Sequence, residues 1–294
     1  KRLGYPPAFS AATLAAAATI DILIPPSIPM ILFALTANAS IAALFVAGIL
    51  PGLLMFGGFT SMCWWVGRRR HFPRDLTPID WSVFRTHLMY ASPALLLPVL
   101  IVVFLRFGIA TPTEVAVLST LYAAAVSVVV YRDLSFKRLN DAVVSAGLAT
   151  GVVLLVIMAS AAIGWLLTYD QMPSGVANWV TRNVSQDWIV ILIMNLLMLF
   201  LGMFIDLPAA ILLLTPVFLP LAQSIGMDPV QLGIMMVVNL AVGLYTPPVG
   251  TTLFITSALA KVKVGQTVRE LGPFYFVAFL VLALVSYVPA SILR

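Results

Sequence analysis

Charged side chains are scarce in this sequence. Only 9% of its 294 residues are Asp, Glu, Lys or Arg, whereas a soluble domain carries about 25%. Hydrophobic residues make up 62% of the chain, and the mean hydropathy is +1.07. Because so few charges cannot give the chain a hydrated surface, the composition excludes an ordinary soluble domain and predicts a polytopic membrane protein.

Cysteine and histidine are nearly missing as well. The one cysteine, Cys63, excludes an internal disulfide and a cysteine-based metal site. His71 and His87 lack metal-ligand spacing, so we expect no transition metal and no cofactor. The 16 basic residues outnumber the 11 acidic ones, but they lie in short loops between apolar runs. By the positive-inside rule, loops with such an excess of basic residues lie on the cytoplasmic side of the membrane, and we expect no nucleic-acid partner.

Two proline pairs interrupt apolar runs that are otherwise long enough to cross a membrane. Pro25 and Pro26 lie within the run 8–37, and Pro247 and Pro248 lie within the run 232–260. Proline has no N–H and clashes with the preceding turn, so each pair predicts a helix broken into two halves. At membrane depth such breaks are tolerated where the freed backbone is buried in protein or lines a wet cavity.

The two breaks belong to an internal repeat with a shift of 222 positions, which carries Pro25 to Pro247. The other matches are Gly4 with Gly226, Pro7 with Pro229, Pro26 with Pro248, and Pro51 with Pro273. We count an odd number of crossings between the repeats, so they should run in opposite directions. Inverted repeats with interrupted helices indicate a secondary transporter with a site near the midplane. The alternative is that each proline pair merely kinks a packed helix.

We therefore predict an all-α membrane fold with inverted repeats, two broken helices and a re-entrant hairpin. The hairpin would occupy 188–221 and turn at Asp206, and Pro216 and Pro220 should shorten its second arm. Further spans are expected at 41–66, 88–107, 115–131, 143–168 and 271–293, with surface helices in 67–87 and 132–142. A hairpin matching this one would precede Lys1, so we expect the chain to be an N-terminally truncated piece of a longer protein.

Each break exposes two kinds of backbone group. The first half-helix ends in carbonyls and the second begins with N–H groups, which suit a small hard cation and a carboxylate respectively. The carbonyls would come from 21–24 and 243–246, and the donors would follow from Ser27 and Gly250. Asp21 and Asp206 lie deep in apolar runs, where a carboxylate costs about 2.5–3.5 kcal/mol. Asp21 is a cation ligand or is protonated, and Asp206 is a ligand, a helix cap or both.

Four motifs resemble the large membrane subunit of TRAP transporters (tripartite ATP-independent periplasmic transporters). They are Ile-Pro-Pro-Ser-Ile-Pro-Met at 24–30, Gly-Ile-Ala-Thr-Pro-Thr-Glu at 108–114, Gly-Met-Phe-Ile-Asp at 202–206, and Gly-Leu-Tyr-Thr-Pro-Pro-Val-Gly at 243–250. Each motif alone is weak, but together they are specific, and the resemblance covers essentially the whole chain.

The resemblance implies sodium-driven uptake of an organic anion across the bacterial inner membrane by an elevator-like movement. The implied partners are a small membrane subunit and a periplasmic substrate-binding protein. A transport domain would comprise 1–66 and 188–294, and the scaffold spans would be 88–168, with a basic loop at 67–87 and a periplasmic interfacial segment at 169–187. The implied sodium ligands are Asp21, Ile24, Pro26, Asp206, Gly243, Thr246 and Pro248. The residues expected at the anion are Pro25, Ser27, Pro247, Gly250, Thr251 and Thr252.

The chain departs from the family pattern at two positions. Family members usually carry a small residue where Asp21 stands, and they often read Thr-Arg-Glu where this chain has Thr168-Tyr169-Asp170. The substrate stays open among C4-dicarboxylates, sialic acids and similar carboxylates. The nearest alternative function is a sodium–dicarboxylate carrier that works without a binding protein. A channel or scaffolding subunit and an intramembrane aspartyl protease using Asp21 and Asp206 are more distant alternatives, and the protease motif Gly-x-Gly-Asp does not occur.

Overall fold

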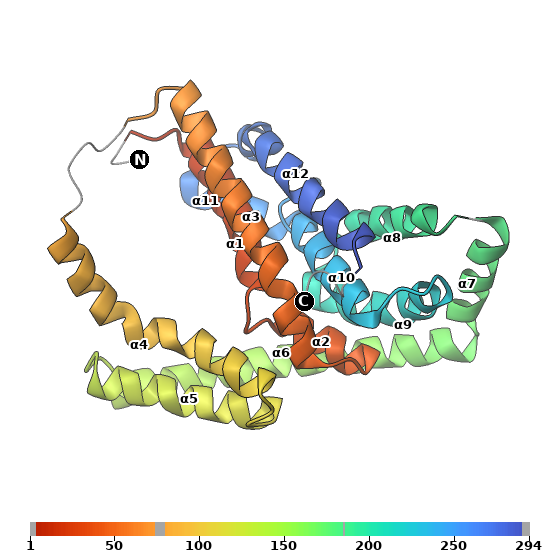
Figure 1. Cartoon of the computed structure of the whole chain (residues 1–294), viewed down its shortest axis with the longest axis horizontal. Helices are drawn as coiled ribbons and strands as arrows, with labels where there is room; N and C mark the ends of the chain where they lie inside the picture. The colour runs from red at the N-terminus through yellow and green to blue at the C-terminus, as the bar shows by residue number, and fades with distance from the viewer. Residues whose placement is uncertain (1–3, 74–79, 185, 290–294) are drawn as a thin grey trace. The chain divides into compact units, whose positions relative to one another are not determined.

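The computed structural model describes residues 4–73, 80–184 and 186–289, and all regular structure in those ranges is α-helical (Figure 1). The prediction of an all-α polytopic membrane protein is confirmed. The helices are α1 (Pro7–Leu23), α2 (Ile28–Ala37), α3 (Ile41–Arg69), α4 (Trp81–Arg106), α5 (Pro112–Val129), α6 (Phe136–Tyr169), α7 (Met172–Asn183), α8 (Asp187–Gly202), α9 (Leu207–Ser224), α10 (Pro229–Gly243), α11 (Thr251–Ala260) and α12 (Val264–Tyr287).

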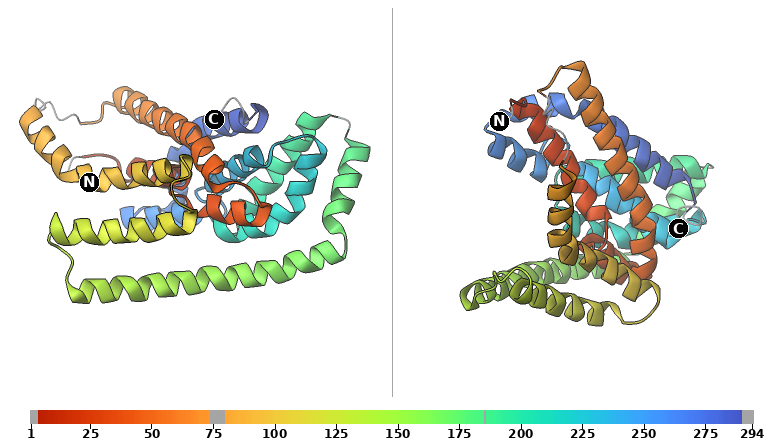
Figure 2. Two further views of the ribbon diagram at one scale, coloured as in Figure 1. Left: turned by 60° about the horizontal axis from the view of Figure 1, so that its bottom comes forward. Right: turned by 60° about the vertical axis from the view of Figure 1, so that its left-hand side comes forward.

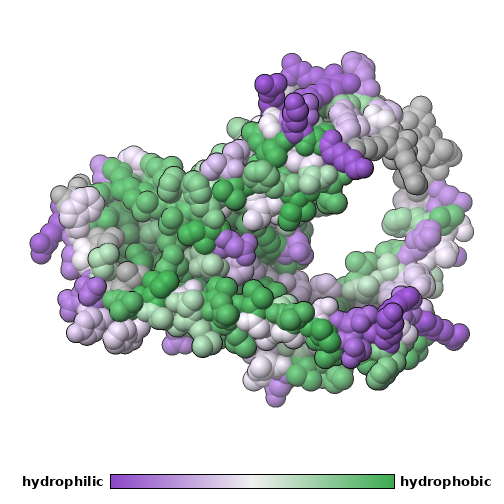
Figure 3. Space-filling view, turned by 180° about the vertical axis from the view of Figure 1, so that it is seen from behind, coloured by the Kyte–Doolittle hydropathy of each residue, from purple (hydrophilic) through white to green (hydrophobic). Residues whose placement is uncertain are grey.

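Six helices within the described ranges are long and apolar enough to cross a membrane, namely α3, α4, α5, α6, α9 and α12. The count rises to seven when α1 and α2 are taken as one span, bent by 45° at residues 24–27. Figure 3 shows the matching surface, in which hydrophobic side chains cover much of the visible face and hydrophilic ones gather in separate clusters. Such a surface suits lipid, so this is a multi-pass membrane protein.

The chain divides into two compact units, each described here by itself. One comprises Lys1–Pro73 and Val156–Arg294 as far as they are described, and the other comprises Arg74–Leu155 with the same proviso. The smaller unit contains α4, α5 and the first part of α6. Two tyrosine hydroxyls on the α5 side bond to α4 carbonyls: Tyr122 donates to Pro93 at 2.8 Å and Tyr131 donates to Tyr90 at 3.1 Å. These bonds join α4 and α5 into a helical hairpin.

The two expected surface helices are not separate elements. The segment 81–87 forms the first turns of α4, and most of 132–142 forms the first turns of α6. No glycine or proline separates Trp81 from Leu88 or Phe136 from Val143, so nothing in the sequence stops either helix from continuing into the span. Asp80 caps α4 by accepting from Ser82 N at 2.9 Å. The helix start expected at Thr77–Pro78 lies outside the described residues.

The larger unit is built around α10. All residues from Val230 to Gly243 on this helix are buried, and it packs against α1, α2, α3, α8, α9 and α12. A helix that is apolar all round belongs inside a bundle. Gly233 permits this crowding, because a Cβ there would lie 2.6 Å from both Phe33 and Leu44. The core of the unit is therefore the first half of the second broken helix.

The structure retains the internal repeat helix by helix. The 222-residue shift carries the start of α1 at Pro7 to the start of α10 at Pro229, and Gly4 and Gly226 both have positive φ, at 77° and 72°. Beyond the breaks a shift of 223 residues carries α2 onto α11 end to end, and the start of α3 onto that of α12. The second repeat thus has one extra residue between Pro248 and Thr251, and the predicted match of Pro51 with Pro273 is one residue off, since this shift carries Pro51 to Phe274. Because α10 also ends two residues earlier than α1 in the repeat, the second break is three residues longer than the first. The peptide bonds Pro25–Pro26 and Pro247–Pro248 are both cis.

The two broken helices run in opposite directions. The first half of one packs on the second half of the other: α1 contacts α11, and α2 contacts α10 (Figure 1). Gly233, near the start of α10, meets Phe33 of α2, which lies beyond the break in the other repeat. Parallel broken helices would instead pair first half with first half throughout. The geometry is that of inverted repeats.

Helices α8 and α9 double back at residues 203–206 to form a helical hairpin (Figure 2). The sequence predicts that Pro216 and Pro220 shorten the second arm, and this is wrong, because α9 continues through both for 18 residues. Internal prolines in membrane helices are tolerated where neighbouring helices pack around them. Here α9 buries Ile211, Phe218 and Leu221 against such neighbours, which offsets the missing bonds.

A buried polar network joins α8, α10 and α12. The side-chain amide of Asn239 donates to the carbonyl and to Oδ1 of Asn195, at 2.9 and 2.8 Å. Asn195 Nδ2 in turn donates to Ser286 Oγ at 3.0 Å. Gln231 Nε2 completes the set by donating to the Ser286 carbonyl at 3.0 Å. In an apolar surrounding each bond fixes the rotation of one helix against the next.

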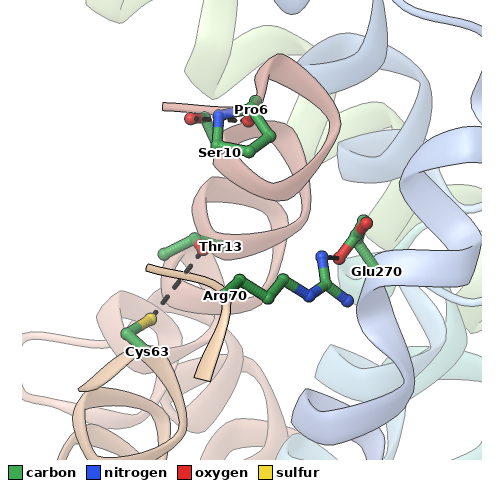
Figure 4. A network of polar contacts seen from close by, with 6 residues as sticks. All are labelled: Pro6, Ser10, Thr13, Cys63, Arg70 and Glu270. Carbon is green, nitrogen blue, oxygen red and sulfur yellow. Dashed lines mark hydrogen bonds and ion pairs between the residues drawn. The ribbon is translucent and has the colours of Figure 1, made fainter. Parts of the chain in front are cut away.

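The ends of the two repeats are also tied by charge. Arg70, after α3, forms an ion pair of 2.6 Å with Glu270 of α12, and Figure 4 shows the pair beside the hydrogen bond between Thr13 and Cys63. Because α3 and α12 occupy equivalent places in the repeats, this pair bridges one repeat to the other.

We expect Asn239→Ala to lower the thermal unfolding temperature of the detergent-solubilised protein. The change strands the buried Asn195 acceptors, which costs about 1–3 kcal/mol. Thr120→Ala is the matched control, since it removes an exposed hydroxyl that bonds only within its own helix, to Ala116. Tryptophan fluorescence on heating measures both. Equal unfolding temperatures for the two variants would show that the network contributes nothing.

Candidate functional site

The first break lies at residues 24–27, between α1 and α2. Ser27 is its polar centre and is only 2% exposed. Its hydroxyl donates to the Ile22 carbonyl at 2.6 Å and accepts from Met30 N at 3.4 Å, so it caps α2 and closes the end of α1 at the same time. The Ser27 proton is therefore engaged within the protein, and one oxygen lone pair stays free.

The carbonyls that end α1 face a different environment. For Asp21, Leu23 and Ile24, the described residues supply no hydrogen bond to the carbonyl oxygen. Two glycines of α3 let this end approach closely. A Cβ on Gly48 would lie 2.7 Å from the Leu23 carbonyl oxygen, and one on Gly52 would lie 2.9 Å from Ile24 Cγ1. The break thus presents oxygen ligands beside a surface of small residues. The Asp21 side chain is exposed on the last turn of α1.

The second break, at residues 244–250, folds back on itself. The Leu244 carbonyl accepts from Thr252 N at 3.0 Å, from Thr252 Oγ1 at 2.7 Å and from Leu253 N at 3.4 Å. The Thr246 hydroxyl donates to the Val242 carbonyl at 2.7 Å, and Thr246 N donates to the Gly243 carbonyl at 3.0 Å. Of the carbonyls at 243–246, only that of Thr246 receives no hydrogen bond from the described residues.

Tyr275 of α12 holds this loop in place. Its hydroxyl donates to the Tyr245 carbonyl at 2.8 Å. The two rings are stacked, with centroids 5.3 Å apart and planes inclined by 16°, and Phe279 stacks on the other side at 6.1 Å. Tyr245 itself is fully buried, and its own hydroxyl has no partner among the described residues. The sequence did not single out either tyrosine.

The two repeats solve the same packing problem with different residues. The 223-residue shift places Tyr275 where the first repeat has Gly52, and both contact the break of their own repeat. Glycine lets α3 approach Ile24 directly, whereas tyrosine reaches across a wider gap to bond the backbone. The two breaks are therefore equivalent in position and distinct in chemistry.

The hairpin turn lies against the second break. A Cβ on Gly243 would be 2.6 Å from the carbonyl carbon and oxygen of Gly202, which means that the backbones of α8 and α10 touch there. Gly250 N donates to the Met203 carbonyl at 3.2 Å. Gly250 has φ of +46°, a conformation that L side chains rarely adopt. Backbone contacts alone thus bring the turn at 203–206 to the loop at 244–250.

Asp206 stands at the N-cap position of α9, in this turn. Its side chain is exposed and makes no capping hydrogen bond. Of the two roles predicted for Asp206, helix cap and cation ligand, the backbone position fits the first. The side chain makes no capping bond, so its carboxylate is open to a ligand. Glu114 differs, because its carboxylate accepts from Thr111 N at 2.7 Å in a complete capping box.

The sequence-predicted residues fall into two groups. The first group lies at the first break and on the turn of α1 that precedes it, and its members are Asp21, Ile24, Pro25, Pro26 and Ser27. A second group gathers where the hairpin turn meets the second break, and its members are Asp206, Gly243, Thr246, Pro247, Pro248, Gly250, Thr251 and Thr252. The ligand roles assigned to these residues stay predictions.

Hydroxyl and N–H donors are not equally available in these groups. Ser27 and Thr252 donate their hydroxyl protons to carbonyls, as described above, and Gly250 N is bonded to Met203. Thr251 opens α11 with an exposed side chain, and no bond to its hydroxyl comes from the described residues. Thr251 is therefore the best placed of the group to meet a ligand anion.

Three contributors were missed from sequence: Tyr275, Met203 and the pair Asn195–Asn239. Met203 acts through its backbone, which no side-chain pattern reports. The asparagines carried a signal, since each is an isolated amide within an otherwise apolar run. Tyr275 could be found only by aligning the two repeats with a one-residue insertion in the second break, which pairs it with Gly52.

Comparison with known proteins places this geometry in a family. The chain matches, over residues 1–291, the family model described as the DctM component of the tripartite ATP-independent periplasmic transporter. It is 57% identical over 290 residues to an uncharacterized protein, y4mL, of Sinorhizobium fredii, covering 99% of this chain and 69% of the relative.

Two further relatives carry functional names. The C4-dicarboxylate TRAP transporter large permease protein DctM of Pseudomonas aeruginosa is 36% identical, over 98% of this chain and 67% of its own length. The isethionate TRAP transporter permease protein DctMQ of Oleidesulfovibrio alaskensis, a fused protein, is 37% identical, over 98% of this chain and 45% of its own length. The chain thus spans about two thirds of the unfused relatives.

We expect Gly243→Ala to separate the hairpin turn from the second break. The new methyl group overlaps the Gly202 backbone, which costs about 1–3 kcal/mol as packed backbones shift. Gly57→Ala is the matched control, because a Cβ at that helical position meets nothing within 4 Å. Thermal unfolding in detergent should fall for Gly243→Ala and hold or rise for Gly57→Ala. A Gly243→Ala protein as stable as the control would contradict the close contact.

Proposed function

Since the chain belongs to the DctM family of TRAP transporter large permease subunits, we propose that it couples sodium entry to uptake of an organic anion by alternating access. The observation that carries the proposal is the pair of broken helices that run in opposite directions through one packed unit. Inverted repeats have nearly equivalent packings facing either side, which is what alternating access needs.

The proposed cation ligands are backbone oxygens at the breaks. A sodium ion that leaves water needs several oxygen ligands in place of its hydration shell. Unpaired carbonyls at the C-terminal end of a half-helix supply such ligands, and the helix dipole there favours a cation. The first break offers the carbonyls of Asp21 and Ile24, with Pro26 beside them. The second offers the unbonded carbonyl of Thr246 with Pro248 and the exposed carboxylate of Asp206, and Gly243, whose carbonyl also accepts from Thr246 N, would add its second lone pair. No cofactor is proposed beyond sodium as the coupling ion.

The proposed anion site uses the start of the second half-helices. The N–H end of a helix carries partial positive charge, and Thr251 adds an exposed hydroxyl there. Pro25, Ser27, Pro247, Gly250 and Thr252 would shape the same space. The relatives' names include a C4-dicarboxylate and isethionate, both organic acids. We propose a C4-dicarboxylate, a sialic acid or a similar carboxylate as substrate; the C4-dicarboxylate name supports this class, whereas isethionate is a sulfonate.

The proposed moving part is a transport domain made of 1–66 and 188–294, with 88–168 as scaffold. Within the larger unit, α10 packs on helices of both repeats and on both arms of the hairpin, so these elements can move as one body. The hairpin is proposed to enter and leave the membrane on one side. The basic loop 67–87 would face the cytoplasm and the segment 169–187 the periplasm.

The proposed partners are a small membrane subunit and a periplasmic binding protein that delivers the anion. The name of the DctMQ relative joins a large and a small component in one protein, which supports the first. A carrier that takes up dicarboxylate without a binding protein is the alternative. The alternative of an intramembrane aspartyl protease using Asp21 and Asp206 is excluded, because the family consists of transport proteins and not of enzymes.

Reconstituted vesicles test the proposal. The intact transporter with its small subunit is placed in liposomes, and uptake of labelled succinate, sialic acid and isethionate is followed with and without an inward sodium gradient and the binding protein. The proposal requires uptake of at least one anion that needs both. Uptake with sodium alone supports the carrier alternative, and uptake that ignores the gradient contradicts the sodium coupling.

Asp206→Asn should raise the sodium concentration for half-maximal uptake by about tenfold, equivalent to about 1.4 kcal/mol. The substitution keeps the shape of the side chain and removes its charge from the hairpin turn. Asp187→Asn, at the start of α8 and far along the hairpin arm from the turn, is the control for loss of an exposed acid of the same hairpin. The same sodium requirement in both variants would remove Asp206 from the cation site.

Tyr275→Phe should raise the half-maximal sodium concentration about fivefold, because losing one hydrogen bond costs about 1 kcal/mol and loosens the second break. The half-maximal anion concentration, measured at saturating sodium, should not change. Tyr287→Phe is the control, since Tyr287 also donates to a carbonyl, that of Trp188 at 3.2 Å, at the far end of α12. Equal sodium dependence in the two variants would limit Tyr275 to a packing role.

A further inference from the structure

The C-terminal end of α3 carries two stacked pairs of arginine and tryptophan. The Arg68 guanidinium lies 5.4 Å from the ring centroid of Trp64, and that of Arg69 lies 5.2 Å from Trp65. Each pair is four residues apart and so stands on one side of the helix, with the cation above the indole face. The indoles are 62% and 47% exposed, so these pairs are not part of the packed core.

The two arginines have no acidic partner within the described ranges. The ion pairs found there are Arg70 with Glu270 and Arg138 with Asp133. Figure 4 shows Arg70 reaching toward Glu270 on α12, so this acid is already paired with the third arginine of the run. Arg68 and Arg69 are left as two uncompensated positive charges on adjacent positions.

The position of the pairs fixes what they can meet. Helix α3 is long and apolar enough to span the membrane, and its basic end belongs on the cytoplasmic side. Exposed indoles at the end of a span lie at headgroup depth, with the ring beside the upper acyl chains. Guanidinium groups stacked on them lie at the level of the phosphates. That leaflet also carries the anionic lipids.

Stacking leaves the binding edge of each guanidinium open. The indole covers one face of the planar cation, while its N–H groups point outward in the plane and can bind phosphate oxygens in pairs. The ring also holds the side chain in one orientation, so less freedom is lost when a ligand binds. We propose that Trp64, Trp65, Arg68 and Arg69 form a binding site for the phosphate headgroup of an anionic phospholipid.

Charge and apolar surface together select the lipid over other anions. A soluble phosphate would use the arginines but not the two exposed rings, which need a hydrophobic neighbour. An acidic protein segment is the competing occupant. Further along the same helix, toward its N-terminus, Leu53, Leu54 and Phe56 are exposed and add apolar surface that suits lipid acyl chains.

The second repeat provides a matched control. Lys261 and Lys263 follow α11 and are exposed, so they place two positive charges at a helix end without aromatic rings next to them in sequence. Removing either pair of charges changes the net charge of the protein by the same amount. Only Arg68 and Arg69 belong to stacked pairs.

The test uses the purified full-length transporter in detergent, titrated with phosphatidylglycerol or phosphatidylcholine and examined by native mass spectrometry. Wild type should retain phosphatidylglycerol in preference to phosphatidylcholine. Arg68→Gln with Arg69→Gln should weaken the tightest phosphatidylglycerol binding about tenfold or more, since each cation near an anionic headgroup contributes about fivefold. Trp64→Leu with Trp65→Leu should weaken it as well, with all charges kept.

Three results overturn the proposal. One is unchanged phosphatidylglycerol retention in the double arginine variant. Another is an equal loss with Lys261→Gln and Lys263→Gln, which would assign binding to net charge. The third is intact lipid retention together with loss of the small subunit, which would make the cluster a protein interface. Thermal unfolding of each variant, measured alongside, shows that the protein tested is folded.

Discussion

The structure depends on where two interrupted helices place their unpaired backbone groups. In hydrocarbon every free N–H and C=O is costly, so a break is stable only when protein groups or a ligand meet its ends. The chain meets most of them internally: Ser27 closes the first break, and Thr252 and Tyr275 close the second. The carbonyl oxygens that receive no hydrogen bond from the described residues, together with the carboxylate of Asp206, which makes no capping bond, define the candidate site.

The burial of α10 explains why the second break is the better organised of the two. A helix surrounded on all sides cannot shift without disturbing six neighbours, so the loop that follows it is held from one end. Tyr275 and the hairpin turn hold it from two others. The first break has no such tyrosine and relies on glycines of α3. Two copies of one backbone path are thus held in place by different contacts.

Much of this could be predicted from the sequence because prolines and glycines report backbone geometry directly. The broken helices, the 222-residue repeat and the turn at Asp206 all follow from such residues. Predictions failed where side-chain polarity was used to place a helix boundary, as at 81–87 and 132–142, because polar residues do not interrupt a helix. Pro216 and Pro220 misled for the opposite reason, since packing outweighed the local signal. The contacts of Met203 and Tyr275 join backbone atoms across the fold, and no local pattern encodes them.

The meeting of Gly202 and Gly243 has a consequence for how such proteins diverge. Because the main chain of Gly202 lies where a Cβ of Gly243 would stand, position 243 cannot acquire a side chain unless α8 moves away. A Cβ on Gly202 would require only a small shift of the Leu240 side chain, at 3.1 Å, so variation should be more restricted at 243 than at 202. The neighbouring residues Thr251 and Thr252, which we propose to lie at the anion, can then vary while this contact between main chains is retained.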